Sequence, residues 1–264
     1  MVVMCRTRLI VVVYLFLLNS PAVAQSLNEV LGAVSKNVKE FQDQLPDFVC
    51  NERVTSRQFD SGRMRKEKVV ESVFTGVQRS TEENRRRFAF AESREVVAID
   101  GKAARKGARF PKLPYHFDGG FSSLLIMTFA PDNLQYHDYS IADRRKSEKD
   151  DALLVQFATK EGQQKLRALF QGTELVEKDV GAAWIDSKSF RVLRLLRQSL
   201  NLPRFFTRSV ATVDYGPMNI DEKQFWMPTK ISAEVTERNS GATVTYLAEY
   251  SDCRKFTADI RIVP

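Results

Sequence analysis

The stretch GAAWIDSKSFRVLRLL, residues 181–196, contains two apolar runs separated by Ser-Lys-Ser. This pattern predicts two antiparallel strands joined by a turn at 187–189. Strict alternation along the second strand would put Phe190, Val192 and Leu196 on one face, and Leu193 and Leu195 on the other. Because a sheet with one wet face alternates more cleanly, we expect both faces of this hairpin to be covered.

Similar strand-like segments surround this hairpin on both sides. They alternate apolar and polar residues and are separated by short polar or Gly-containing turns. These segments are 48–59, 63–78, 85–100, 134–145, 152–160, 204–216, 223–238, 242–250 and 253–263. Long strands with short turns indicate an antiparallel meander. Residues 165–180 fit either a short helix or a strand.

Two segments predict helices. Ser26 with Glu29 forms a capping box, the apolar residues after it recur at helical spacing, and Pro46 ends the pattern. Residues 119–130 are the most apolar stretch after residue 25. They fit a short buried helix closed by Pro131, with a buried strand as the alternative. The segment 102–118, with two prolines and many basic residues, predicts a loop or a flap. The fold class is therefore mainly β with a few helices (α+β).

The N-terminus has the pattern of a secretory signal peptide. Arg6 and Arg8 precede an apolar run at 9–18, and Ala22-Val23-Ala24 provides an A-x-A cleavage site. The run is shorter than the ~20 residues that span a bilayer, which disfavours the alternative of a membrane anchor. We therefore expect cleavage after Ala24, a periplasmic or secreted location, and one β-rich domain over 25–264 with no transmembrane segment.

The formal net charge is +7, and +5 once Arg6 and Arg8 are removed. A basic exported protein can meet anionic head groups or acidic polymers. Because 33 acidic residues are interspersed with the basic ones, the sequence favours a diffuse role in solubility. A cluster such as 85–87 predicts a charged strand edge rather than a nucleic-acid site.

Two cysteines, Cys50 and Cys253, remain after the signal peptide. Two thiols in an exported chain favour a disulfide, and two buried unpaired thiols are the alternative. Metal binding by two thiolates without a nearby histidine is disfavoured.

Catalytic motifs are missing from the sequence. The segment FSSLL at 121–125 lacks the G-x-S-x-G elbow of a nucleophilic serine. A Ser122, His116 and Asp118 set, or a metal site built on His116 and His137, would rest on no recognised spacing. We therefore expect no enzyme activity, no cofactor and no metal, with a hydrolase using His116 or His137 as the least favoured alternative.

The 181–196 hairpin resembles a feature of the periplasmic outer-membrane lipoprotein carrier and sigma-regulator superfamily. There, a G-x-x-W-[IV]-D strand turns into a strand with an R-[IV]-x-R pattern. The matching residues here are Gly181, Trp184, Ile185, Asp186, Arg191, Val192 and Arg194. The chain also resembles a group of uncharacterised secreted bacterial proteins with L-P-x-F-x-C near the start and R-K-F-x-A-D near the end, found here at 45–50 and 254–259.

The superfamily resemblance implies a curved antiparallel half-barrel whose apolar concave face is plugged by helices and holds acyl chains. The residues expected to line such a cavity are Leu124, Leu125, Met127, Phe129, Trp184, Leu193, Leu195, Phe205, Phe206 and Trp226; ordinary core packing is the alternative for each. The implied function is a non-enzymatic carrier for a lipid, an acylated protein or an envelope component. An envelope scaffold or signalling module that pairs through sheet edges or the 102–118 loop is the second hypothesis.

Overall fold

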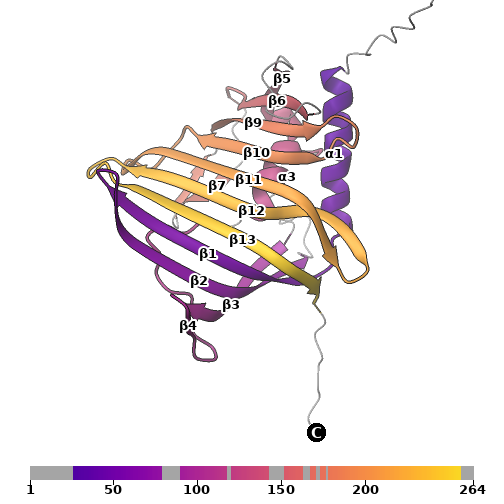
Figure 1. Cartoon of the computed structure of the whole chain (residues 1–264). Helices are drawn as coiled ribbons and strands as arrows, with labels where there is room; N and C mark the ends of the chain where they lie inside the picture. The colour runs from indigo at the N-terminus through magenta and orange to yellow at the C-terminus, as the bar shows by residue number, and fades with distance from the viewer. Residues whose placement is uncertain are drawn as a thin grey trace, which may run out of the picture.

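One curved antiparallel sheet of 11 strands forms most of the molecule (Figure 1). The computed structural model describes residues 26–78, 90–117, 120–142, 152–162, 167–170, 173–176 and 178–256. The strands of the sheet are β1 (Phe48–Asp60), β2 (Arg63–Gln78), β3 (Phe90–Ile99), β4 (Lys102–Ala103), β5 (His137–Ile141), β6 (Ala152–Thr159), β9 (Asp179–Asp186), β10 (Val192–Ser199), β11 (Phe206–Ile220), β12 (Lys223–Glu237) and β13 (Thr243–Lys255). The expected signal peptide lies outside the described residues.

The strand order is β4-β3-β2-β1-β13-β12-β11-β10-β9-β6-β5, so the sheet does not close into a barrel. Most neighbours are consecutive in the chain. The exceptions among the long strands are β1 with β13, and β6 with β9. The pairing of β1 with β13 joins the first and the last long strand in the interior of the sheet. The predicted α+β fold with a curved antiparallel half-barrel is confirmed.

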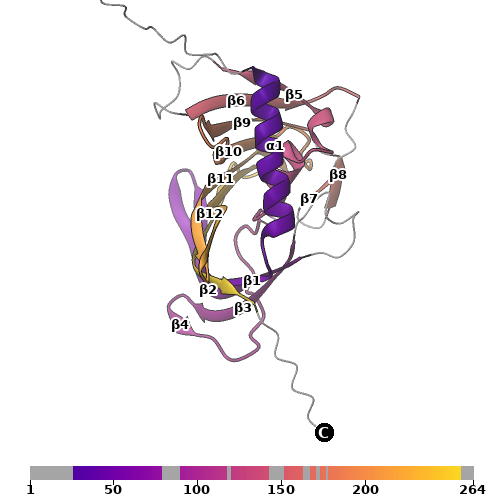
Figure 2. The same ribbon diagram turned by 90° about the vertical axis from the view of Figure 1, so that its right-hand side faces the viewer.

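Helix α1 (Leu27–Gln44) stands beside one end of the strands (Figure 2). It begins as predicted, because the Ser26 hydroxyl accepts the Glu29 N–H at 3.3 Å and the Glu29 carboxylate accepts the Ser26 N–H at 2.9 Å. Its buried face includes Val30, Val34 and Val38. No described helix is both long enough and apolar enough to span a membrane.

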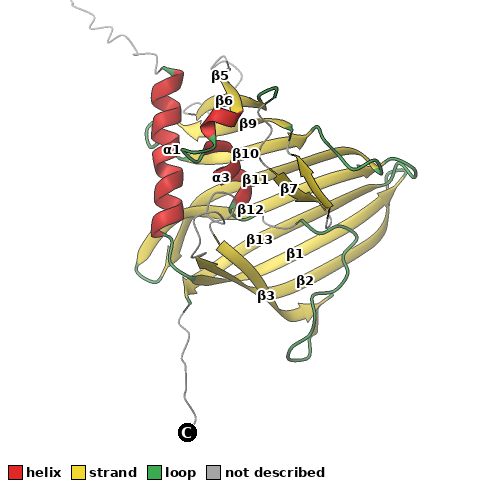
Figure 3. Ribbon diagram, turned by 180° about the vertical axis from the view of Figure 1, so that it is seen from behind, coloured by secondary structure: helices red, strands yellow, loops and turns green. Residues whose placement is uncertain are grey.

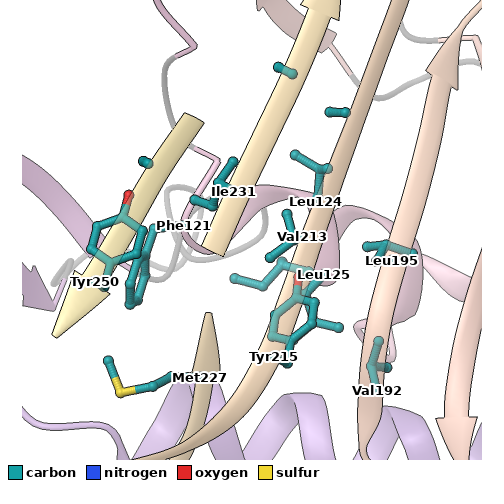
Figure 4. Packing of buried hydrophobic residues seen from close by; sticks show 14 of the residues in the cluster. Phe121, Leu124, Leu125, Val192, Leu195, Val213, Tyr215, Met227, Ile231 and Tyr250 are labelled. Carbon is teal, nitrogen blue, oxygen red and sulfur yellow. The ribbon is translucent and has the colours of Figure 1, made fainter. Parts of the chain in front are cut away.

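Helix α3 (Ser123–Phe129) lies on the concave side of the sheet and is buried along its whole length (Figure 3). The buried helix predicted within 119–130 is therefore found over Ser123–Phe129, with Ala130 as its C-cap just before Pro131. Its side chains pack against the middle strands, as Figure 4 shows for Leu124 and Leu125 beside Val213.

The hairpin at 181–196 forms strands β9 and β10, as predicted. A bulge between Val192 and Arg194 shifts the alternation by one residue. Val192 and Leu195 are therefore both buried, whereas Leu196 lies on the other face with Arg194. The expected assignment of faces was wrong, because strict alternation takes no account of a bulge.

The cysteine prediction is confirmed by a disulfide between Cys50 and Cys253, which are 203 residues apart. The bond lies where the register between β1 and β13 shifts, since Val49 pairs with Arg254 but Asn51 pairs with Ser251. The disulfide thus links the first long strand to the last.

Residues in the ambiguous 165–180 region form a separate two-stranded sheet, β7 (Arg167–Phe170) with β8 (Thr173–Val176). Strand β11 continues through Gly216 and Pro217 to Ile220, where a turn had been expected. A bulge at Asp214 and Tyr215 accommodates this continuation. The expected turn at 146–151 and the basic run at 85–87 lie outside the described residues.

Candidate functional site: a pocket on the concave face

The concave face of the sheet has a filled region under the helices. Phe121, Leu124 and Phe129 are each at most 2% exposed. The space between α1, Leu125, the 190–192 segment and Trp226 is a cavity of only about 120 Å³. The region beneath residues 119–130 is therefore a packed core, and it leaves little room for a ligand.

A larger pocket of about 790 Å³ opens on the same face, away from α1. Its walls come from four parts of the chain: β3, the 110–116 segment, the start of β11 and the hairpin between β12 and β13. The lining residues are Glu92, Ser93, Arg94, Phe110, Pro111, Lys112, Leu113, Pro114, Tyr115, His116, Phe205, Phe206, Glu237, Asn239 and Val244. Its volume falls within the range of about 300–1,000 Å³ that is typical of small-molecule sites.

The pocket is amphipathic. The residues that β3 contributes, Glu92, Ser93 and Arg94, are all polar. Three and five strands away, β13 and β11 contribute the apolar residues Val244 and Phe206. An apolar wall facing a polar one suits a ligand with a hydrocarbon part and a polar part.

The 110–116 segment is attached to the sheet through the fully buried side chain of Ser56 in β1. The Ser56 hydroxyl accepts the N–H of Tyr115 at 3.0 Å and donates to the carbonyl of the same residue at 2.9 Å. Leu113 and Tyr115 are buried. This part of the 102–118 segment is therefore packed against the concave face.

A buried ion pair supports the polar wall. The Arg94 side chain donates to both oxygens of the Glu52 carboxylate, at 2.8 and 3.1 Å, and Ser72 donates to the same carboxylate at 2.7 Å. The Arg94 guanidinium also lies 4.9 Å from the centre of the Phe74 ring and 3.7 Å from the Glu92 carboxylate. Burial lowers the pKa of Arg94, but the charge of Glu52 more than offsets this, so the pKa lies above its ordinary value.

A second buried polar cluster lies near the other edge of the sheet, beneath β5. The Asp179 carboxylate accepts a hydrogen bond from Thr159, forms an ion pair with Arg197, and lies 3.2 Å from Nε2 of His137. His137 is 2% exposed and does not line the large pocket. This cluster fixes β5 and β9 relative to β10, which is a structural role.

The ten residues expected to line a cavity are divided among several environments. Phe205 and Phe206 line the large pocket, and Leu125 and Trp226 line the small one. Leu124, Met127, Phe129 and Leu195 are buried in the packed region. Trp184 pairs with the exposed Arg194 across the hairpin, so it lies on the opposite face of the sheet, and Leu193 is half-buried at the bulge. The structure thus brings only Phe205 and Phe206 together at the pocket described above.

The sequence did not single out most residues of this pocket. Glu92, Arg94 and Val244 come from strands whose patterns look ordinary, and they meet only through the curvature of the sheet. The one available signal was the segment RFPKLPYHF at 109–117, which combines aromatic residues with prolines between two polar stretches.

The proposed histidine sites do not assemble among the described residues. His116 lines the large pocket and His137 lies in the Asp179 cluster, while Asp118 is outside the described residues. Within the described part of the chain, no group of three or more His, Cys, Asp or Glu side chains could hold a metal ion.

The fold and the pocket together define a half-barrel α+β protein with a partly filled concave face. No protein-family model and no curated protein matches the sequence. Its resemblance to the secreted L-P-x-F-x-C group thus remains untested.

Among solved structures, the chain is similar to a DUF1329 family protein from Desulfovibrio piger, with 12% identity, 88% of this chain and 94% of the other covered, and a TM-score of 0.40. It is also similar to a LolA superfamily protein from Nitrosomonas europaea, with 13% identity, coverage of 87% and 94%, and a TM-score of 0.39. A third structure, described as an outer-membrane lipoprotein-sorting protein domain from Vibrio parahaemolyticus, has 11% identity, coverage of 85% and 91%, and a TM-score of 0.36.

Proposed function

We propose that this protein binds and carries an amphipathic ligand that bears a hydrocarbon chain, such as a lipid or an acylated protein. The observation that supports this proposal most directly is the amphipathic pocket of about 790 Å³ on the concave face. Each methylene group that leaves water for such an apolar wall contributes about 0.8 kcal/mol. The hydrocarbon would contact Phe110, Phe206 and Val244, with the polar end towards Arg94.

The proposed position of the ligand differs from the one expected from the sequence. Residues 123–129 were expected to cover a cavity, but their side chains fill that space. The pocket lies between the 110–116 segment and the far ends of β11 to β13 instead. A ligand there needs no displacement of α3.

A fluorescent fatty-acyl probe tests the proposal by titration. We expect wild-type protein to bind it, and Phe110→Asp to weaken binding about tenfold or more, because an ionised side chain would replace an apolar wall. The matched control is Phe59→Asp, since Phe59 is likewise half-buried but does not line the pocket. Equal affinities of the two variants, or no binding by wild type, would refute the proposal.

A further inference from the structure

The end of the sheet opposite α1 carries a cluster of exposed hydrophobic side chains. Among the described residues, five large hydrophobic side chains are strongly exposed: Met64 at 56%, Val97 at 51%, Leu200 at 47%, Phe205 at 44% and Phe256 at 38%. Leu200 and Phe205 lie in the loop between β10 and β11, and Met64 lies beside the turn between β1 and β2. Three of the five thus lie at the strand ends on one side of the molecule.

Strand pairing places these side chains along one border. The pairs across successive strands are Met64 with Phe59, Phe59 with Thr243, Thr243 with Thr236, and Thr236 with Arg208. Four spacings of about 4.8 Å separate Met64 from Arg208, so this border is roughly 19 Å long. Figure 1 shows it as the row of hairpin tips at the left, away from α1.

Hydrogen bonds attach the β10–β11 loop to neighbouring segments at this border. The Arg238 guanidinium donates to the carbonyl of Arg204 at 2.7 Å and to that of Phe206 at 3.1 Å. The Asn201 side chain donates to the carbonyl of Val176 at 2.8 Å. These bonds to Arg238 and Val176 fix the backbone of the loop, and Leu200 and Phe205 stay exposed to solvent. Because burial of such side chains is favourable, their exposure marks this loop as a candidate interaction surface.

Segments at this border and next to it carry an excess of positive charge. Segments 57–67, 199–208 and 234–243 contain seven basic and four acidic residues. The 102–112 segment has five basic residues and no acidic one. It begins at the level of Val70, six residues along β2 from Met64, and its last residues line the pocket beside Phe205. These segments together carry a net charge of +8, whereas the whole chain carries +7. Basic charge is thus denser in these four segments than in the chain as a whole.

We propose that this border, defined as residues 57–67, 199–208 and 234–243, docks together with the adjoining residues 110–112 on the surface of an anionic phospholipid bilayer. Apolar side chains on short loops enter the interfacial region, and surrounding basic residues attract anionic head groups. Phe205 belongs both to the border and to the pocket lining, so docking would bring the pocket mouth to the bilayer. This inference is independent of what the pocket binds.

Co-sedimentation with vesicles tests the proposal. One set of vesicles is pure phosphatidylcholine, and the other is phosphatidylcholine and phosphatidylglycerol in equal parts. We expect wild-type protein to sediment with the anionic vesicles and to be released by added salt, because surface charges are screened. Leu200→Ser and Arg204→Glu should each weaken the binding by about tenfold or more. Neither residue lines the pocket, so failure of ligand binding and failure of docking are distinguishable.

A matched pair of phenylalanines provides the control. Phe205 and Phe256 are similarly exposed, but Phe256 follows β13 at the α1 end of the strands. Phe205→Ser should reduce vesicle binding and Phe256→Ser should leave it unchanged. Circular dichroism and thermal unfolding confirm that each variant is folded. Equal effects of the two substitutions, equal binding to both kinds of vesicle, or no binding to either would overturn the proposal; the last result would assign the surface to an acidic protein partner instead.

Discussion

The side chain of Ser56 and the backbone of Tyr115 form a reciprocal pair of hydrogen bonds, with the hydroxyl accepting at 3.0 Å and donating at 2.9 Å. Ser56 is completely buried in β1, and Tyr115 belongs to the segment that roofs the pocket. One hydroxyl thus satisfies both backbone groups of a residue that has no strand partner. The roof of the pocket depends on this contact.

Replacing Ser56 with Ala should loosen the 110–116 segment. The substitution leaves a buried N–H and a buried carbonyl without their partner, which costs about 1–3 kcal/mol each. We therefore expect a lower free energy of unfolding by denaturant, and faster tryptic cleavage after Arg109 and Lys112. The control is Ser232→Ala, in a half-buried position on β12. Unchanged cleavage in Ser56→Ala would show that the contact does not hold the roof.

Removing either partner of the ion pair between Glu52 and Arg94 should strongly destabilise the fold. Glu52→Ala or Arg94→Ala leaves one buried charge uncompensated, so each should lower the free energy of unfolding by about 3–5 kcal/mol. The double variant should be less destabilised than the sum of the two, and a double-mutant cycle measures this difference. Additive effects would mean that the two side chains do not interact.

The disulfide between Cys50 and Cys253 should contribute strongly to stability, since it closes a loop of about 200 residues. We expect Cys50→Ser with Cys253→Ser to lower the free energy of unfolding by about 2–5 kcal/mol. Reducing agent should then have no further effect on the double variant. Equal stability of the oxidised wild type and the variant would contradict a structural role.

The Asp186 carboxylate should make the 187–189 turn sensitive to acid. It accepts the Ser189 N–H and hydroxyl, each at 2.7 Å, and the Lys188 N–H at 3.2 Å. The bonds from Ser189 chiefly lower the pKa of Asp186 below its ordinary value. A carboxylate with a lowered pKa stabilises the fold above its unfolded-state pKa of about 3.9, and this contribution is lost as the pH falls through the folded-state pKa.

The test compares wild type with Asp186→Asn in thermal unfolding between about pH 7 and pH 2. The difference in melting temperature between the two should shrink as the pH falls, because protonation removes what the ionised carboxylate contributes. A constant difference across this range would show that ionisation of Asp186 does not stabilise the turn.

Local sequence signals predicted the elements that depend on neighbouring residues. The capping box of Ser26 and Glu29, the apolar segment before Pro131 and most strands were found because their patterns are short-range. The cysteine pair was found because only two thiols remain after the expected cleavage. The curved half-barrel was expected because the sequence resembles a known superfamily. The structure confirms it with one curved sheet of 11 paired strands.

The pocket could not be predicted in the same way, because it depends on long-range geometry. Ser56 and Tyr115 are 59 residues apart, and Glu52 and Arg94 are 42 apart. The bulge after Val192 put Leu195 and Leu196 on the faces opposite to those expected, and the exposed hydrophobic residues at the strand ends became visible only once three distant segments were brought together. Periodicity indicates which residues of a strand or helix are buried, but it does not indicate where the packed core ends and a pocket begins.

Photo-crosslinking with a diazirine-bearing fatty acid tests the central claim most directly, because mapping the labelled peptides locates the hydrocarbon. The account predicts labels within 110–116, at Phe205 and Phe206, and near Val244, competed away by unlabelled fatty acid. Competable labels confined to 123–129 and the α1 cavity, or labels scattered without competition, would contradict it.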